Sequence, residues 1–122
     1  MATVTPTITG ARPLANSADS ALVTWTPLTN ANNVGVEVAY EDYADRTVQM
    51  FGTFGGATVV LQGSCDGGTT WATLTDPQGN AISTSAALLE AVQEAVPLIR
   101  PSLSGGAGTS VTVILFVRGN HK

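Results

Sequence analysis

Apolar and polar residues alternate along most of the chain after Asp19, which is the pattern of half-buried β-strands. In VGVEVAYE, every second residue from Val34 to Tyr40 is apolar and would share one face of a strand. In SVTVILFVR, Val111 to Val117 share one face in the same way, but Ile114 and Phe116 make the opposite face apolar as well. This last run therefore predicts a strand that is covered on both sides.

Turn signals rich in Gly, Asn and Asp separate these runs. They lie at residues 29–33, 54–57, 65–68, 76–80 and 104–108. Strands of this length, separated by such turns every 8–12 residues or so, are typical of a β-sandwich or a β-barrel. The sequence therefore predicts an all-β domain.

One segment departs from the alternating pattern. In SAALLEAVQEAV, residues 85–96, the residues Leu88, Leu89, Val92 and Val96 fall at helical spacing. A serine or threonine among residues 83–85 could cap the helix, and Pro97 would end it. The segment predicts at most one short helix near residues 85–95, and a strand with a bulge is the alternative.

The first 18 residues are rich in Thr, Pro and Ala and read as an extended N-terminal arm, with the sandwich domain occupying residues 19–122. Val4, Pro6 and Ile8 alternate with threonines, so this segment could add as a strand to the exposed sheet edge of a neighbour. These three residues are the predicted interface, and a tail without a partner is the alternative. We expect the sandwich to fold without residues 2–17, because the alternating runs begin after Asp19.

The charge pattern excludes some partners and favours others. Charged residues make up 11% of the chain, and residues 47–65 and 101–117 contain none, whereas about 25% is usual. A pI near 4.6 with scattered Arg and Lys argues against nucleic acid. The longest apolar run, Val113–Val117, is too short to span a bilayer. Such a charge-poor surface suits a protein that lies against another protein.

The stretch SCDGGTTW, residues 64–71, raises the question of a reactive loop around Cys65. A cysteine nucleophile needs a base, and the only histidine is His121 near the end of the chain. Metal sites and phosphate loops need ligands or a lysine that this stretch lacks. We interpret Asp66, Gly67 and Gly68 as a structural turn in a tight hairpin. We expect the protein to have no catalytic residues, no metal site and no cofactor.

Two other groups of residues could bind a ligand. The acidic residues Glu41, Asp42 and Asp45, which precede Arg46, could hold a cation, although a solvated loop is the simpler interpretation. Four aromatic residues could form a platform for a sugar, but core packing is the simpler interpretation for the tryptophans among them, which lie in alternating runs. The four are Trp25, Tyr40, Tyr43 and Trp71.

Part of the chain resembles a known class of proteins. Residues 51–119 contain a glycine-led strand, an S-x-D-G-x-x-W hairpin, a DPxGN turn and a closing RP…SGG hairpin. This pattern resembles small β-sandwich virion proteins of tailed bacteriophages, which are described as head decoration or cement proteins. Cys65 stands where many such hairpins have a polar residue, and the first 50 residues match no class known to us.

We expect a single jelly-roll-like antiparallel β-sandwich of roughly seven or eight strands. The resemblance implies a structural role, and we expect no enzymatic activity. The expected partner is the major capsid protein, with the chain forming a homo-oligomer in the virion capsid after assembly in the host cytoplasm. Two other functions stay open at this point. One is a carbohydrate-binding β-sandwich module, because similar hairpins occur there, and the other is a phage tail or fibre subunit.

Overall fold

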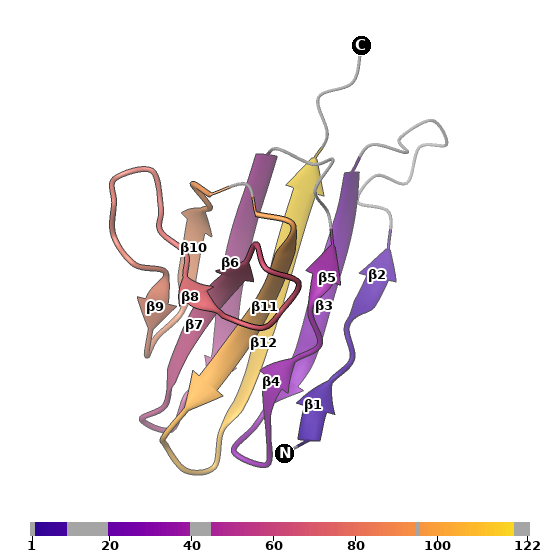
Figure 1. Cartoon of the computed structure of the whole chain (residues 1–122). Coiled ribbons are helices and arrows are strands. Elements are labelled where there is room, and N and C mark those ends of the chain that lie inside the picture. The colour runs from indigo at the N-terminus through magenta and orange to yellow at the C-terminus, as the bar shows by residue number, and fades with distance from the viewer. Residues whose placement is uncertain (1, 10–19, 40–44, 95, 119–122) are drawn as a thin grey trace.

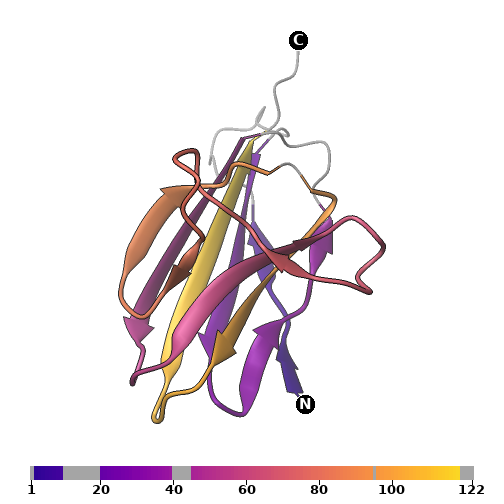
Figure 2. The same ribbon diagram turned by 60° about the vertical axis from the view of Figure 1, so that its left-hand side comes forward.

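The computed structural model describes residues 2–9, 20–39, 45–94 and 96–118, and every regular element within these ranges is a β-strand. The strands form two sheets that pack face to face as a β-sandwich (Figure 1). Figure 2 shows the same two layers after a turn of 60°. The all-β prediction is therefore confirmed for the part of the chain that is described.

The first sheet has five strands and contains the longest ones. Its spatial order is β10 (Leu88–Ala91), β6 (Asp45–Thr53), β12 (Ser110–Arg118), β3 (Ser20–Leu28) and β2 (Thr7–Thr9). The central strand β12 pairs antiparallel with both β3 and β6 over nearly its whole length. One face of β12 lies in the core, whereas Ile114 and Phe116 on its other face are partly exposed. The prediction of a strand covered on both sides is therefore wrong for the described residues.

The second sheet has seven strands, of which four are very short. Its main order is β1 (Ala2–Val4), β4 (Asn32–Gly35), β11 (Leu98–Ser104), β7 (Thr58–Ser64) and β8 (Ala72–Thr73), with β5 (Val38–Ala39) beside β11 and β9 (Ser83–Thr84) beside β7. Its pairings are antiparallel except for β1 with β4, which is parallel. The sandwich is thus antiparallel apart from this edge.

The core lies between the two sheets and follows from the alternation of side chains along the strands. Its most deeply buried residues are no more than 2% exposed, and they include Val23, Trp25, Val48, Met50, Val113 and Leu115 from the first sheet and Val59, Leu61, Ile99 and Leu103 from the second. Because successive side chains point to opposite faces, each long strand contributes every second residue to this core.

Trp25 is the largest residue in the core and is completely buried. Its indole N–H donates to the backbone carbonyl of Val36 at 2.9 Å, which connects the first sheet to the second. A Cβ atom on Gly35 would lie 2.5 Å from the indole ring. Glycine is therefore required at position 35 to make room for the ring.

The N-terminal segment differs from the predicted arm. Residues 2–4 form β1 on the second sheet, and residues 7–9 form β2 on the first sheet, so the segment crosses from one sheet to the other within its own chain. Val4 is 8% exposed and belongs to the core. The expectation that the core begins after Asp19 is therefore wrong, because Val4 fills space between the sheets. Residues 10–18 of the predicted arm lie outside the described residues.

The short helix expected near residues 85–95 does not form in the described part of that segment, and a strand, the alternative interpretation, takes its place. This segment contains β10, which pairs antiparallel with β6 from Leu88 opposite Met50 to Ala91 opposite Thr47. Val92 is buried, whereas Leu89 is 66% exposed. An open edge on β6 supplies hydrogen bonds to these residues, and this tertiary pairing overrides the weak helical spacing.

The two tryptophans give a matched test of the core. Replacing Trp25 by Phe should lower the free energy of unfolding by about 2 kcal/mol, because the change leaves a cavity and removes the donor for the Val36 carbonyl. Trp71→Phe, at a half-exposed position, should cost less than about half as much. Urea denaturation of both variants measures the difference, and equal losses would contradict the assigned role of Trp25.

Candidate functional site

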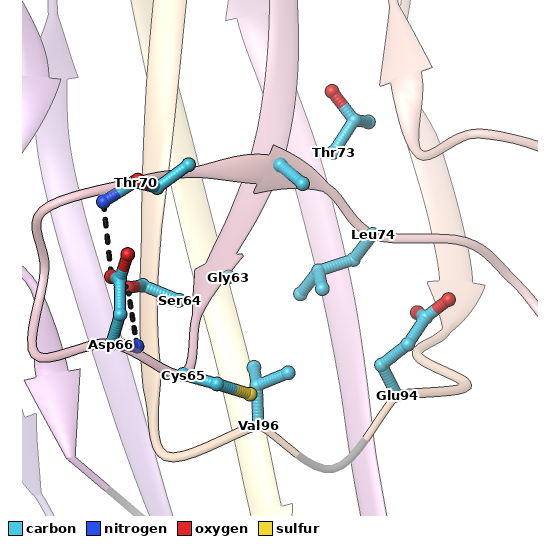
Figure 3. A pocket seen from close by; sticks show the side chains of 10 residues that line it. Gly63, Ser64, Cys65, Asp66, Thr70, Thr73, Leu74, Glu94 and Val96 are labelled. Carbon is cyan, nitrogen blue, oxygen red and sulfur yellow. Dashed lines mark hydrogen bonds between the residues drawn. The ribbon is translucent and has the colours of Figure 1, made fainter.

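The loop of residues 64–71 joins β7 to β8 and contains the conspicuous SCDGGTTW stretch. The two strands pair as far as Gly63 opposite Ala72, so the loop is wider than the tight hairpin expected from sequence. Figure 3 shows this loop beside a cavity at the end of the sandwich. The loop and the cavity together form the candidate site.

The side chain of Asp66 organises this loop. Its Oδ1 atom accepts hydrogen bonds from the backbone N–H groups of Thr69 at 3.1 Å and Thr70 at 3.0 Å, and from the hydroxyl of Ser64 at 2.7 Å. The bonds from Thr70 and Ser64 contribute most to a lowered pKa of Asp66, which falls to about 2. The carboxylate is therefore engaged in holding the loop, which leaves it poorly suited to act as a base.

Two glycines allow the chain to turn here. Gly67 and Gly68 have φ angles of 81° and 93°, a region that residues with a Cβ atom rarely adopt. The backbone N–H of Gly68 also donates to the Ser64 hydroxyl at 3.0 Å. The structure thus places Asp66, Gly67 and Gly68 in one compact turn.

Cys65 lies next to the cavity and is exposed. The cavity has a volume of about 400 Å³ and is lined mainly by Leu74, Val96, Gly63 and polar groups of the loop. Figure 3 shows the sulfur directed toward Val96. No histidine occurs in the described residues, so the structure brings no base of that type to the thiol there.

Glu94 lines the opposite side of the cavity and anchors the segment that follows β10. Its carboxylate accepts bonds from the backbone N–H of Thr75 at 2.8 Å and from the Thr75 hydroxyl. Burial acts to raise the pKa of Glu94, but hydrogen bonds, chiefly those from Thr75, together outweigh it, and the pKa lies below its ordinary value. Like Asp66, this carboxylate is committed to internal hydrogen bonds.

The aromatic residues do not gather into one platform among the described residues. Trp25 is in the core, and Tyr40 and Tyr43 lie outside the described residues. Trp71 is half-exposed, and the guanidinium of Arg100 stacks over its ring at 4.1 Å from the centroid. One face of this ring is therefore occupied by a cation from the same chain.

The acidic stretch at residues 40–45 is only partly described. Asp45 forms an exposed ion pair with Arg118 at 2.9 Å, whereas Glu41 and Asp42 lie outside the described residues. Arg46 is 3% exposed, and its guanidinium donates to the carbonyl of Glu94 at 3.2 Å. Arg46 lies on the same face of β6 as the buried Val48 and Met50, because every second residue points inward. The burial of Arg46 could therefore have been predicted from the sequence.

The described residues contain no group of three or more His, Cys, Asp and Glu side chains arranged to hold a metal ion. No helix in the same ranges is long and apolar enough to cross a membrane. Comparison with protein families, curated proteins and solved structures finds no match to this chain. The assignment of a function therefore depends on the physical properties of the molecule.

The role assigned to Asp66 predicts a pH dependence. Its pKa is lowered from 3.8 to about 2, so its contribution to stability is complete above the higher value and is lost as the pH falls toward the lower one. The urea midpoint of Asp66→Asn should lie below that of the native chain at about pH 6 and approach it at about pH 2. Asp45→Asn, which removes an exposed ion pair, is the control and should change the midpoint little at any pH.

Two variants in the loop test whether the protein depends on the backbone geometry at Gly67 or on the thiol of Cys65. Gly67→Val should destabilise the protein by about 1–3 kcal/mol because valine resists a positive φ. Cys65→Ser should leave both the denaturation midpoint and assembly unchanged, since the thiol is exposed. Loss of assembly in Cys65→Ser alone would show that the sulfur has a chemical role.

Proposed function

We propose that this chain is a structural virion protein that binds and stabilises a bacteriophage capsid shell. The observation that carries the proposal is the uncharged N-terminal edge of the sandwich. Residues 2–9 contain no charged side chain and form the edge strands β1 and β2, one on each sheet. Ile8 is 52% exposed at this edge. Another chain can add a strand to such an edge, and little charge has to be desolvated when it does.

We further propose that the sandwich is a jelly roll. The order of the strand pairs supports this proposal. Along the chain, a strand that pairs within one sheet is followed by a strand that pairs within the other sheet, which is the order of a long hairpin folded over on itself. The antiparallel pairs β3–β12 and β6–β10 lie in the first sheet, and β4–β11 and β7–β8 lie in the second. Jelly rolls occur in viral capsid and lectin domains, so this arrangement favours a virion protein by analogy of fold.

The predicted interface is revised by the position of its residues. Val4 is part of the chain's own core, Pro6 is half-buried, and Ile8 is exposed. Val4 therefore supports the edge from inside, and Ile8 is the residue of the three that can contact the major capsid protein. The proposed location is the virion capsid, and the proposed role is structural rather than enzymatic.

A carbohydrate-binding module is the second candidate. The half-exposed ring of Trp71 beside Arg100 favours it, because aromatic rings stack on the apolar faces of sugars. Trp25 cannot contribute to such a site from the core. A tail or fibre subunit would use the same uncharged edge, with copies arranged around a tail axis instead of over a shell.

Co-sedimentation tests the proposal directly. The purified chain is mixed with empty shells of the major capsid protein from the same virus, and the bound fraction is measured. The native chain should bind, and Ile8→Glu should raise the Kd at least about tenfold because a charge is then buried at the contact. Gln78→Glu adds the same charge at an exposed turn and should bind like the native chain.

The outcomes separate the candidates. A native chain that stays in the supernatant contradicts the capsid function, and binding to tails alone favours the tail subunit. Equal binding by Ile8→Glu shows that the N-terminal edge is not the anchor. Binding that a soluble oligosaccharide abolishes favours the carbohydrate-binding module.

A further inference from the structure

The outer face of the five-stranded sheet differs from the rest of the surface. Apart from Asp45 and Arg118 at one end, the outward side chains of its described residues include threonines, Ser110, one glutamine, one alanine and five larger apolar residues. The five are Leu22, Phe51, Leu89, Ile114 and Phe116. Phe51 is 39% exposed and Leu89 66%, and the other three are partly exposed. Apolar side chains that are exposed in this way, interspersed with threonines on one face, make the face a candidate interaction site.

The face is free of charge over its whole central area. Its charged residues are confined to one end, where Asp45 and Arg118 pair with each other. The hydroxyls of Thr26 and Thr112 also bond to each other at 2.8 Å on this face. Covering the central area would therefore remove no charged group of the described residues from water, so the cost of desolvation is lower than for a charged surface.

The outer face of the other sheet provides a contrast. There, Arg100 bonds to Gln62 and stacks over Trp71, and each of these side chains is partly exposed. Covering that face would require the removal of water from a guanidinium. The difference identifies the five-stranded sheet as the side of the sandwich that is suited to burial.

We propose that two copies of this chain associate through the outer faces of their five-stranded sheets. Because the two faces are identical, they have the same right-handed twist, which lets sheets pack aligned at about 30° and about 10 Å apart. Among the described residues, no charged side chain lies in the central area of this face, so no like charges of those residues meet there. The two-fold arrangement is the commonest one for soluble homo-oligomers.

The size of the face is sufficient for a specific dimer. The five strands of this sheet contain 34 residues in all. With a rise of about 3.3 Å per residue and a spacing of about 4.8 Å between strands, they cover roughly 540 Å². A standard interface buries about 800 Å² on each partner. Two such faces would bury roughly 1,100 Å² in total, which is less than a standard interface but reaches the lower bound of about 1,000 Å² for a specific one.

This inference deepens the proposed function by naming the surface through which the homo-oligomer forms. Its test needs no shell, so its failure is distinguishable from a failure of capsid binding. The N-terminal edge around Ile8 stays at the side of the dimer, where it can contact another protein.

Sedimentation of the purified full-length chain tests the dimer. The mass of one chain is 12.5 kDa, and the expected species at about 100 µM has twice this mass. Ile114→Glu should raise the dimer Kd at least about tenfold, because two carboxylates would be buried near each other. Val60→Glu, at a partly exposed position on the outer face of the other sheet, is the matched control and should remain dimeric.

A further variant distinguishes loss of the dimer from loss of folding. Leu89→Glu changes a residue that is already 66% exposed, so it should fold normally, as circular dichroism can check, and should still weaken the dimer. A native chain that is monomeric at about 100 µM would overturn the proposal. So would a dimer that Ile114→Glu and Leu89→Glu leave intact, or one that Val60→Glu dissociates equally.

Discussion

The hydrogen bond from Trp25 to the carbonyl of Val36 is the contact on which the arrangement of the two sheets depends most. It joins β3 in one sheet to the chain just after β4 in the other. The N–H of Val36 in turn donates to the carbonyl of Val4 at 2.8 Å, which fixes the N-terminal strand. Gly35 leaves space for the indole ring. One buried side chain therefore takes part both in the packing of the two sheets and in the placement of the first strand.

The long strands could be predicted from sequence because their side chains alternate. β6, β7, β11 and β12 each alternate between buried and more exposed residues over most of their length, and the turns around Gly67 and Gly79 have the positive φ angles that their composition suggested. The burial of Arg46 follows from the same alternation. The alternation of apolar and polar residues was sufficient to predict burial wherever burial depends only on which face of the strand a side chain occupies.

Other features could not be predicted, because they depend on residues far apart in sequence. The segment around Leu88 is a strand only because β6 offers an open edge, and the N-terminal residues are strands of the sandwich because β3 and β4 accept them. The stacking of Arg100 on Trp71 and the bonds from Thr75 to Glu94 join separate parts of the chain. Spacing along the sequence contains no signal for such contacts.

The scarcity of charge links the fold to the proposed assembly. Interactions between uncharged surfaces are little affected by ions, whereas contacts between exposed charges weaken as salt increases. The most direct measurement is therefore the Kd for empty capsid shells at about 0.05 M and about 0.5 M NaCl. The account predicts binding at both concentrations, with values that differ by less than about threefold. Binding that weakens more than about tenfold at the higher concentration, or no binding at either, would contradict it.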